Sequence, residues 1–216
     1  MAKNKFIDSN HFYGILMRGD RVSQDLLNIL QVKELREQRW KSAIEEIYRK
    51  DNLNYEYLLI GGPYNGYILL LSKAVKSLKY ALNLCNDLKD KYSAVLSLVN
   101  DVHLGVYRYI KIEDQKIVRF FERDANSVTG EFGDLTIEER QLLENSSEHD
   151  YFHTVRLLEN ILDLQTLRND ETVLRKNVIV GKRYLEDIEK YKEYLFLLKK
   201  NKEPLTQKDN HIDLPF

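Results

Sequence analysis

The chain contains one cysteine, three prolines and nine glycines among its 216 residues. A single cysteine excludes an intramolecular disulfide framework and a zinc site built from several cysteines. So few prolines and glycines argue against a loop-rich scaffold. No apolar run approaches the roughly 20 residues that a membrane helix needs, and no apolar stretch follows the opening residues, so we expect no membrane anchor and no signal peptide. We therefore expect a cytoplasmic protein.

An excess of one charge sign is also missing, because 33 basic and 34 acidic side chains leave a formal net charge of -1. Such a balance gives no bulk electrostatic attraction for nucleic acid, so direct nucleic-acid binding is not expected. What is present is 43% hydrophobic and 31% charged residues. That composition is typical of a folded globular protein, and a chain of this length can bury a core without disulfides or metals.

The first half of the chain mixes helical and strand-like patterns. A short helix is expected after Ser23, which can cap it, and a second helix over residues 34–49, where apolar residues recur at helical spacing. Strands are expected over residues 55–60 and 67–71. The pair Asn65-Gly66 between them is a strong turn signal, because both residues tolerate positive φ.

The clearest hairpin comprises residues 106–112 and 116–123, which flank the polar turn Glu113-Asp114-Gln115. Beyond it, Thr136 and Glu139 fit a capping box, in which a threonine at the cap is followed three residues later by a glutamate. These residues therefore predict a helix that begins near residue 137.

The last expected helix spans residues 183–200, and its apolar residues are spaced four, three, four and three apart. They are Tyr184, Ile188, Tyr191, Leu195 and Leu198. This spacing is that of a coiled-coil seam, but about two heptads are too short to hold a dimer alone. The seam must pack on its own domain or on a second copy, which would give a homodimer through this helix.

Together these patterns predict an α+β fold, in which a small, mainly antiparallel sheet is covered by helices. The expected divisions are an N-terminal arm with a short helix (1–33), an α+β core domain (34–148), a helical C-terminal region (149–200) and a flexible tail (201–216).

Few residues suggest catalytic chemistry. His149 and His153 are four apart, so a helix would place both on one face, as in the zinc-protease motif. Asp150 stands where that motif has glutamate, and no third ligand is evident, so we interpret the pair as solvated residues at a helix start. Cys85 lies on the apolar side of an expected helix and is interpreted as a small hydrophobic residue. We expect no metal, no cofactor and no enzyme activity.

Aromatic and basic residues alternate along the 106–123 hairpin. The candidates for a partner-binding surface are Tyr107, Tyr109, Arg119, Phe121 and Arg123. Such a surface could stack nucleobases, although tyrosine and arginine are also favoured at protein interfaces. Alternation in a strand can equally bury one set and expose the other. We rank sheet core with a polar face first, and a protein partner above a nucleic acid.

A sparse set of features occurs in a fixed order between residues 40 and 143. Trp40 precedes a strand pair, Gly66 opens an apolar strand, the hairpin carries a short acidic turn, and the segment 133–139 closes it. This part of the chain resembles bacterial proteins described as immunity proteins of polymorphic toxin systems, although Tyr67 replaces the commoner tryptophan. The resemblance implies a non-enzymatic binder that blocks a toxin.

The final residues are Asp213, Leu214, Pro215 and Phe216. They resemble the acidic tip of bacterial single-stranded-DNA-binding proteins, except that Lys208 and His211 interrupt the acidic run. In such a tip the terminal phenylalanine fills an apolar pocket and its carboxylate meets a basic side chain. The leading hypothesis is thus an immunity-type inhibitor of a cognate toxin. The alternative is a DNA replication, repair or phage accessory protein that recruits partners through this tip.

Overall fold

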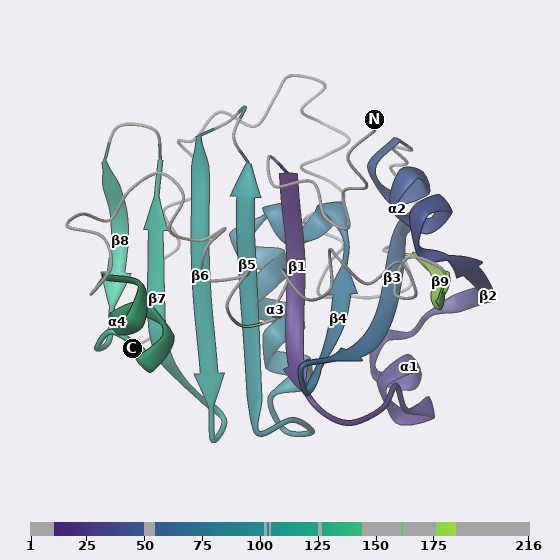
Figure 1. Ribbon diagram of the computed structural model, residues 1–216, viewed down its shortest axis with the longest axis horizontal. Coiled ribbons are helices and arrows are strands. Elements are labelled where there is room, and N and C mark those ends of the chain that lie inside the picture. Colours follow the sequence, from purple (N-terminus) through teal and green to yellow (C-terminus); the bar gives the residue numbers. More distant parts are fainter. Residues whose placement is uncertain are drawn as a thin grey trace.

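The computed structural model describes residues 11–49, 55–101, 103, 105–124, 127–143, 161 and 176–184. Its main feature is one nine-stranded sheet with the strand order β2-β9-β3-β4-β1-β5-β6-β7-β8 (Figure 1), in which every paired neighbour is antiparallel. The strands are β1 (His11–Arg18), β2 (Lys33–Arg39), β3 (Tyr55–Tyr64), β4 (Tyr67–Leu71), β5 (Ala94–Asp101), β6 (Val106–Glu113), β7 (Lys116–Arg123), β8 (Val128–Phe132) and β9 (Asn177–Tyr184).

Short helices lie on both faces of this sheet. Within the described residues they are α1 (Gln24–Leu30), α2 (Trp40–Arg49), the 3-10 helix η1 (Lys73–Lys76), α3 (Leu78–Leu88) and α4 (Ile137–Leu143). Helices α1, η1 and α3 contribute to the apolar core on one face, and α2 to the core on the other. Figure 1 shows α3 behind the sheet and α4 in front of β7.

Both faces of the central part of the sheet are buried, because successive side chains of a strand point to opposite faces and each face has its own core. On the α3 side the core includes Ile15, Leu70 and Ile110. On the α2 side it includes Leu16 and Leu69. The strand expected over residues 67–71 is β4, and its last four residues are fully buried.

The turns and caps follow the local sequence. Asn65 and Gly66 have φ of 48° and 77°, and Asp114 and Gln115 have φ of 47° and 66°, the positive values that tight hairpin turns require. Ser23 caps α1, because its Oγ accepts a hydrogen bond from the Leu26 amide at 3.2 Å. These two hairpins and this helix cap confirm the sequence predictions.

The predicted fold class is wrong. A small sheet covered by helices was expected, whereas the structure is dominated by a large antiparallel sheet of nine strands, and the longest described helix, α3, has 11 residues. The difference arises because strands outside the expected core domain complete the sheet. Strand β1 lies in its middle, between β4 and β5, and β9 lies between β2 and β3.

Two expected helices begin in residues that form strands. The helix expected over 34–49 is strand β2 followed by α2, and the first two residues of the helix expected over 183–200 belong to β9. Strand β2 has the sequence Lys-Glu-Leu-Arg-Glu-Gln-Arg, whose residues favour helix locally. Pairing with β9 overrides that preference. Residues 185–200 lie outside the described residues.

None of the helices in the described ranges is both long enough and apolar enough to cross a membrane.

Candidate functional site

The five hairpin residues proposed from the sequence lie on one face of β6 and β7. Tyr107 is opposite Arg123 and Tyr109 is opposite Phe121, and opposite residues in antiparallel strands share a face. Four of the five side chains are buried, and Arg123 is partly exposed. Burial, together with the nearby carboxylates of Glu138 and Glu139, raises the pKa of Tyr109 far above its ordinary value. The hairpin side chains therefore belong to the core first, and partner contact through them stays a prediction.

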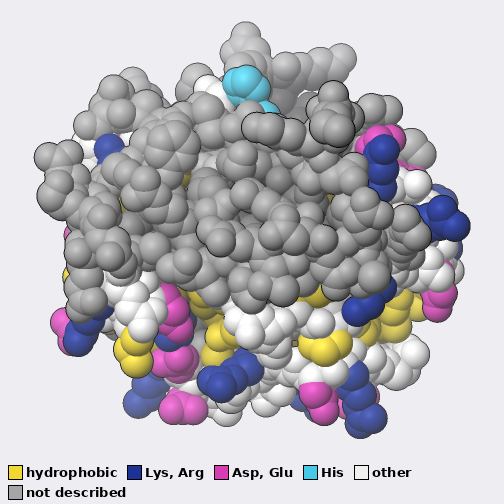
Figure 2. Space-filling model, in the orientation of Figure 1, with side chains coloured by type: hydrophobic (Ala, Val, Ile, Leu, Met, Phe, Trp, Pro, Cys, Tyr) yellow, Lys and Arg dark blue, Asp and Glu magenta, His cyan; other side chains and the backbone are white. Residues whose placement is uncertain are grey.

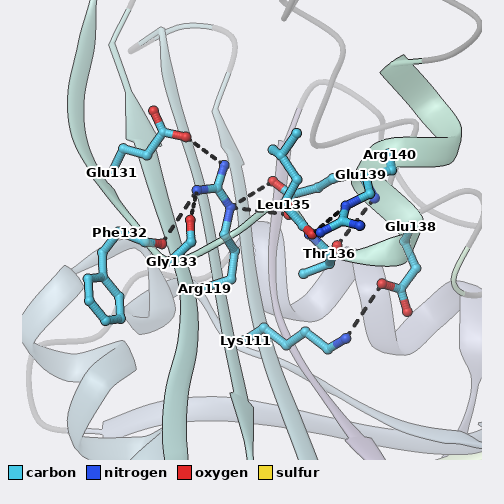
Figure 3. A network of polar contacts seen from close by, with 10 residues as sticks. All are labelled: Lys111, Arg119, Glu131, Phe132, Gly133, Leu135, Thr136, Glu138, Glu139 and Arg140. Atoms are coloured by element: carbon cyan, nitrogen blue, oxygen red, sulfur yellow. Dashed lines mark hydrogen bonds and ion pairs between the residues drawn. The ribbon is translucent and has the colours of Figure 1, made fainter.

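Arg119 organises the polar contacts at this end of the sheet (Figure 3). Its Nε donates to both carboxylate oxygens of Glu139 at 3.0 and 3.1 Å, and its Nη1 donates to the carbonyl oxygen of Gly133 at 2.9 Å. Its Nη2 lies 2.8 Å from Oε1 of Glu131 in an ion pair. The guanidinium is 1% exposed, so these partners replace the water that a buried charge needs.

Glu139 also completes the predicted capping box of α4. Its Oε2 accepts from the Thr136 amide at 2.8 Å, and its own amide donates to Thr136 Oγ1 at 3.2 Å. The same carboxylate thus caps the helix and neutralises Arg119. This double use fixes α4 against β7.

Lys111 adds a second tie between β6 and α4. Its Nζ lies 2.9 Å from Glu113 Oε1 and 3.5 Å from Glu138 Oε2. Burial by itself would lower the pKa of Lys111, but the two carboxylates outweigh it and raise that pKa. The lysine therefore stays charged and paired.

Strands β7 and β8 with helix α4, which we call the β8 end, also carry exposed apolar side chains. Among the described residues the exposed large hydrophobics are Leu35 (45% exposed), Val118 (36%), Val128 (49%), Phe132 (41%) and Ile137 (72%). Four of these five lie at the β8 end. At the lower left of Figure 2, a few apolar side chains lie among charged ones. Phe132 is opposite Phe120 and Val128 is opposite Arg123, so these two exposed side chains lie on different faces of β8. Each face of this end therefore offers exposed apolar side chains to a partner.

No local sequence pattern marks this surface. Residues 128–132 follow a strand and include Gly130, with Gly133 just beyond, and such glycines are typical of a loop. The pairing of Phe132 with Phe120 in β7 makes the segment a strand. Its exposure follows from its place at the edge of the sheet, which local sequence does not specify.

A second buried polar cluster lies under α3. Glu56 accepts hydrogen bonds from the hydroxyls of Ser72 and Tyr80, and Nη1 of Arg183 donates to Tyr80 Oη at 3.1 Å and lies 3.7 Å from Glu56 Oε1. Burial raises the pKa of Glu56 to about 7, against the lowering effect of Arg183. All four residues are buried, so the cluster joins β3, β9 and α3 and presents no open surface to a substrate.

A third cluster joins β1, β5 and η1. Asp101 Oδ2 accepts from the Tyr13 hydroxyl at 2.7 Å and lies 3.1 Å from Lys76 Nζ. Arg108 donates to the Lys76 carbonyl oxygen at 3.1 Å and pairs with Glu122. Burial lowers the pKa of Arg108, and Glu122 opposes that shift. This cluster too is used to hold elements of the fold together.

No group of three or more histidine, cysteine, aspartate or glutamate side chains in the described part of the chain is arranged to hold a metal ion. Cys85 is fully buried on the apolar side of α3, as the sequence predicted, and burial raises its pKa to about 12. A small hollow of about 180 Å³ beside α1 is lined by Asp20, Arg21 and Tyr92 among others, which is less than a typical small-molecule site.

Several residues singled out from the sequence lie outside the described residues. They are His149, His153, Asp213, Leu214, Pro215 and Phe216. Their roles stay predictions.

Comparison with protein-family models gave no match, and neither did comparison with curated proteins or with solved structures. The functional argument therefore depends on the geometry of the chain itself.

Proposed function

We propose that this chain is a non-enzymatic, cytoplasmic protein-binding module that inhibits a cognate toxin by binding it, in the manner of an immunity protein. The observation that carries the proposal is the concentration of exposed apolar side chains at the β8 end. Four of the five exposed large hydrophobics in the described residues lie there. An apolar surface rimmed by polar residues is characteristic of protein–protein contact.

The polar networks support the proposal by making this surface rigid. Arg119 and Glu139 connect α4 to β7, and Lys111 connects it to β6. A surface that is already ordered before binding loses less conformational entropy when it meets a partner. The buried charges therefore contribute to binding indirectly, by holding the exposed residues in place.

The charge of the β8 end favours a basic partner. Residues 111–140 contain eight acidic and five basic side chains, and two of the basic ones, Lys111 and Arg119, are buried in ion pairs. Opposite charge across an interface speeds association and disfavours wrong partners. On this proposal the inhibition is steric, because this chain, once bound, covers the active surface of the toxin.

The test is protection of cells that express the toxin encoded by the neighbouring gene. The wild-type chain should restore growth and co-purify with the toxin in a 1:1 complex. Phe132→Lys should lose both properties. Leu35→Lys is the matched control, because Leu35 has almost the same exposure but lies on β2, at the other edge of the sheet, and it should behave as wild type. Absence of protection and of complex by the wild-type chain would refute the proposal.

The alternative role in DNA replication or repair rests on Asp213, Leu214, Pro215 and Phe216. It predicts the opposite effects of the variants on partner binding. Removal of these four residues would abolish partner binding, whereas Phe132→Lys would leave it unchanged. The same binding assay therefore separates the two functions.

A further inference from the structure

One cross-strand row of side chains takes a residue from each of the nine strands on the α3 side of the sheet. In spatial order it comprises Glu37, Ile179, Ile60, Leu70, Ile15, Ser97, Ile110, Phe120 and Phe132. Its interior members are buried or partly buried. Apart from Ser97, the row is thus an apolar band that runs from β9 to β8.

The two ends of this row differ in chemistry. At the β2 edge it ends in Glu37, an exposed charged residue. At the β8 edge it ends in Phe132, an aromatic residue that is 41% exposed. Phe132 lies opposite Phe120, which belongs to the buried core. Within the described residues, the apolar band therefore continues through Phe120 to Phe132 on the edge strand β8.

Natural proteins protect free sheet edges with charge and with bulges, and β2 has both features. Five of its seven residues are charged, Glu34 has a φ of 52°, and the register shifts between Lys33 and Arg36. Strand β8 also has a register shift, because Gly130 and Val128 lie opposite the consecutive residues Glu122 and Arg123, but it has only one charged residue, Glu131, among its five. An edge with so little charge is suited to pair with another strand.

The corresponding cross-strand row on the opposite face has a charged residue at each edge of the sheet. It includes Arg36 on β2, Tyr109 and Phe121 on the hairpin, and Glu131 on β8. Glu131 is paired with Arg119 on one oxygen but its side chain is 48% exposed. Strand β8 thus presents an aromatic ring on one face and a carboxylate on the other, at adjacent positions.

We infer that β8 is the edge at which the partner docks, by adding an extended segment of its own chain as a further antiparallel strand. This inference rests on the proposed function and names the partner's chemistry. The added segment carries an apolar residue beside Phe132 and a lysine or arginine beside Glu131, so basic and apolar residues alternate along it. In such strand addition the main chain supplies affinity and alternate side chains supply specificity.

Charge selects a basic partner over a second copy of this chain. Pairing of two β8 strands would bring two acidic ends together, each with eight acidic and five basic side chains over residues 111–140. Like charges across an interface oppose association. A basic segment has the complementary charge, and it leaves the pairs of Arg119 and Lys111 intact.

The test uses a fluorescent peptide of alternating lysine and valine, seven residues long with blocked ends, added to the full chain. Fluorescence anisotropy should show saturable binding. The matched peptide with glutamate in place of lysine should bind at least about tenfold more weakly. Amide chemical-shift changes in the protein should centre on residues 128–132. Equal binding of the acidic peptide, or shifts centred on β2, would overturn the inference.

Single substitutions test the same inference in a second way. Phe132→Lys should weaken peptide binding about tenfold or more, Glu131→Gln should weaken it less, and Leu35→Lys should leave it unchanged. Thermal melting checks that each variant is folded, and the comparison of the two peptides needs no variant at all. A wild-type dimer that Phe132→Lys converts to monomer would show that a second copy is the occupant and would refute the inference.

The outcomes separate the inference from the proposed function. If the toxin binds equally well to wild type and to Phe132→Lys, the immunity function stands and docking at β8 is refuted. If the toxin does not bind the wild-type chain while the alternating peptide does, docking at β8 stands for a basic partner and the immunity function is refuted.

Discussion

Arg119 is a buried cation whose contacts are made by residues distant in the sequence. It sits on β7, and its partners are the side chains of Glu131 and Glu139 and the carbonyl oxygens of Phe132 and Gly133. A buried pair of charges contributes little net stability. The pair instead holds β7 and α4 in fixed relative positions. Removing one partner would leave the other charged and without solvent.

Replacement of Arg119 by methionine should therefore destabilise the fold strongly. The carboxylate of Glu139 would remain buried without its cation, at a cost of about 3–5 kcal/mol in the free energy of unfolding. Urea denaturation measures this. Lys116→Met, at an exposed position on the same strand, should change stability by less than about 0.5 kcal/mol. Similar small losses in both variants would contradict the role given to Arg119.

Glu56 should make stability depend on pH in a direction that is unusual for a carboxylate. Burial raises its pKa to about 7 from 4.5, while Arg183 on β9 opposes the shift and Tyr80 on α3 faces the same carboxylate. The folded state therefore binds the proton more tightly than the unfolded state. Its contribution is fully present below pH 4.5 and is lost as the pH rises through 7, a change of roughly 3 kcal/mol.

Glu56→Gln should remove that dependence. Unfolding free energies of the wild type should fall relative to the variant between pH 4.5 and 7, as measured by urea titrations at several pH values. A difference that stays constant, or that grows with pH, would show that Glu56 is charged in the folded state over this range.

At the scale of elements, two glycines with nearly equal φ have different surroundings. Gly66 in the β3–β4 turn has φ of 77° and no atom within 4 Å of an added Cβ, whereas Gly133 between β8 and α4 has φ of 79° and the Val118 carbonyl oxygen 2.1 Å away. The first position tolerates a side chain with backbone strain alone. The second also has a steric clash, and it lies in the loop that bonds Arg119.

Replacing each of these glycines by alanine should separate the cost of backbone strain from the cost of the steric clash. Gly66→Ala should lose about 1–2 kcal/mol, the penalty for an L-residue in the left-handed region. Gly133→Ala should lose roughly 1–3 kcal/mol more, because the loop must move to admit the methyl group. Thermal or urea unfolding of the two variants decides this, and equal losses would mean that the loop after β8 adjusts freely.

Elements with strong local signals were predictable and those set by distant pairing were not. The turns at Asn65-Gly66 and Asp114-Gln115 and the capping box at Thr136 are local, so the sequence was sufficient for them. Strand β2 is predominantly charged and forms by pairing with β9, about 140 residues away. No pattern within residues 33–39 indicates that pairing, and the helix propensity of these residues by itself predicts a helix.

At the scale of the whole molecule, the size of the sheet explains why hairpin side chains are buried on both of its faces. Alternation in β6 and β7 predicts one buried and one polar face if a sheet is covered on one side. Here helices lie on both sides, so Tyr109 and Arg119 on one face and Arg108 on the other are all buried. The exposed surface instead lies at the edge, and the position of an edge depends on the order of all nine strands.

The measurement that tests the central claim most directly is hydrogen exchange of the backbone amides in the complex with the alternating lysine–valine peptide. Strand addition at β8 would give the amides along that edge hydrogen-bond partners on the added strand. The account predicts that protection increases at residues 128–132, while β2 at the other edge exchanges as in the free chain. Protection confined to β2, or a complex that leaves residues 128–132 unchanged, would contradict it.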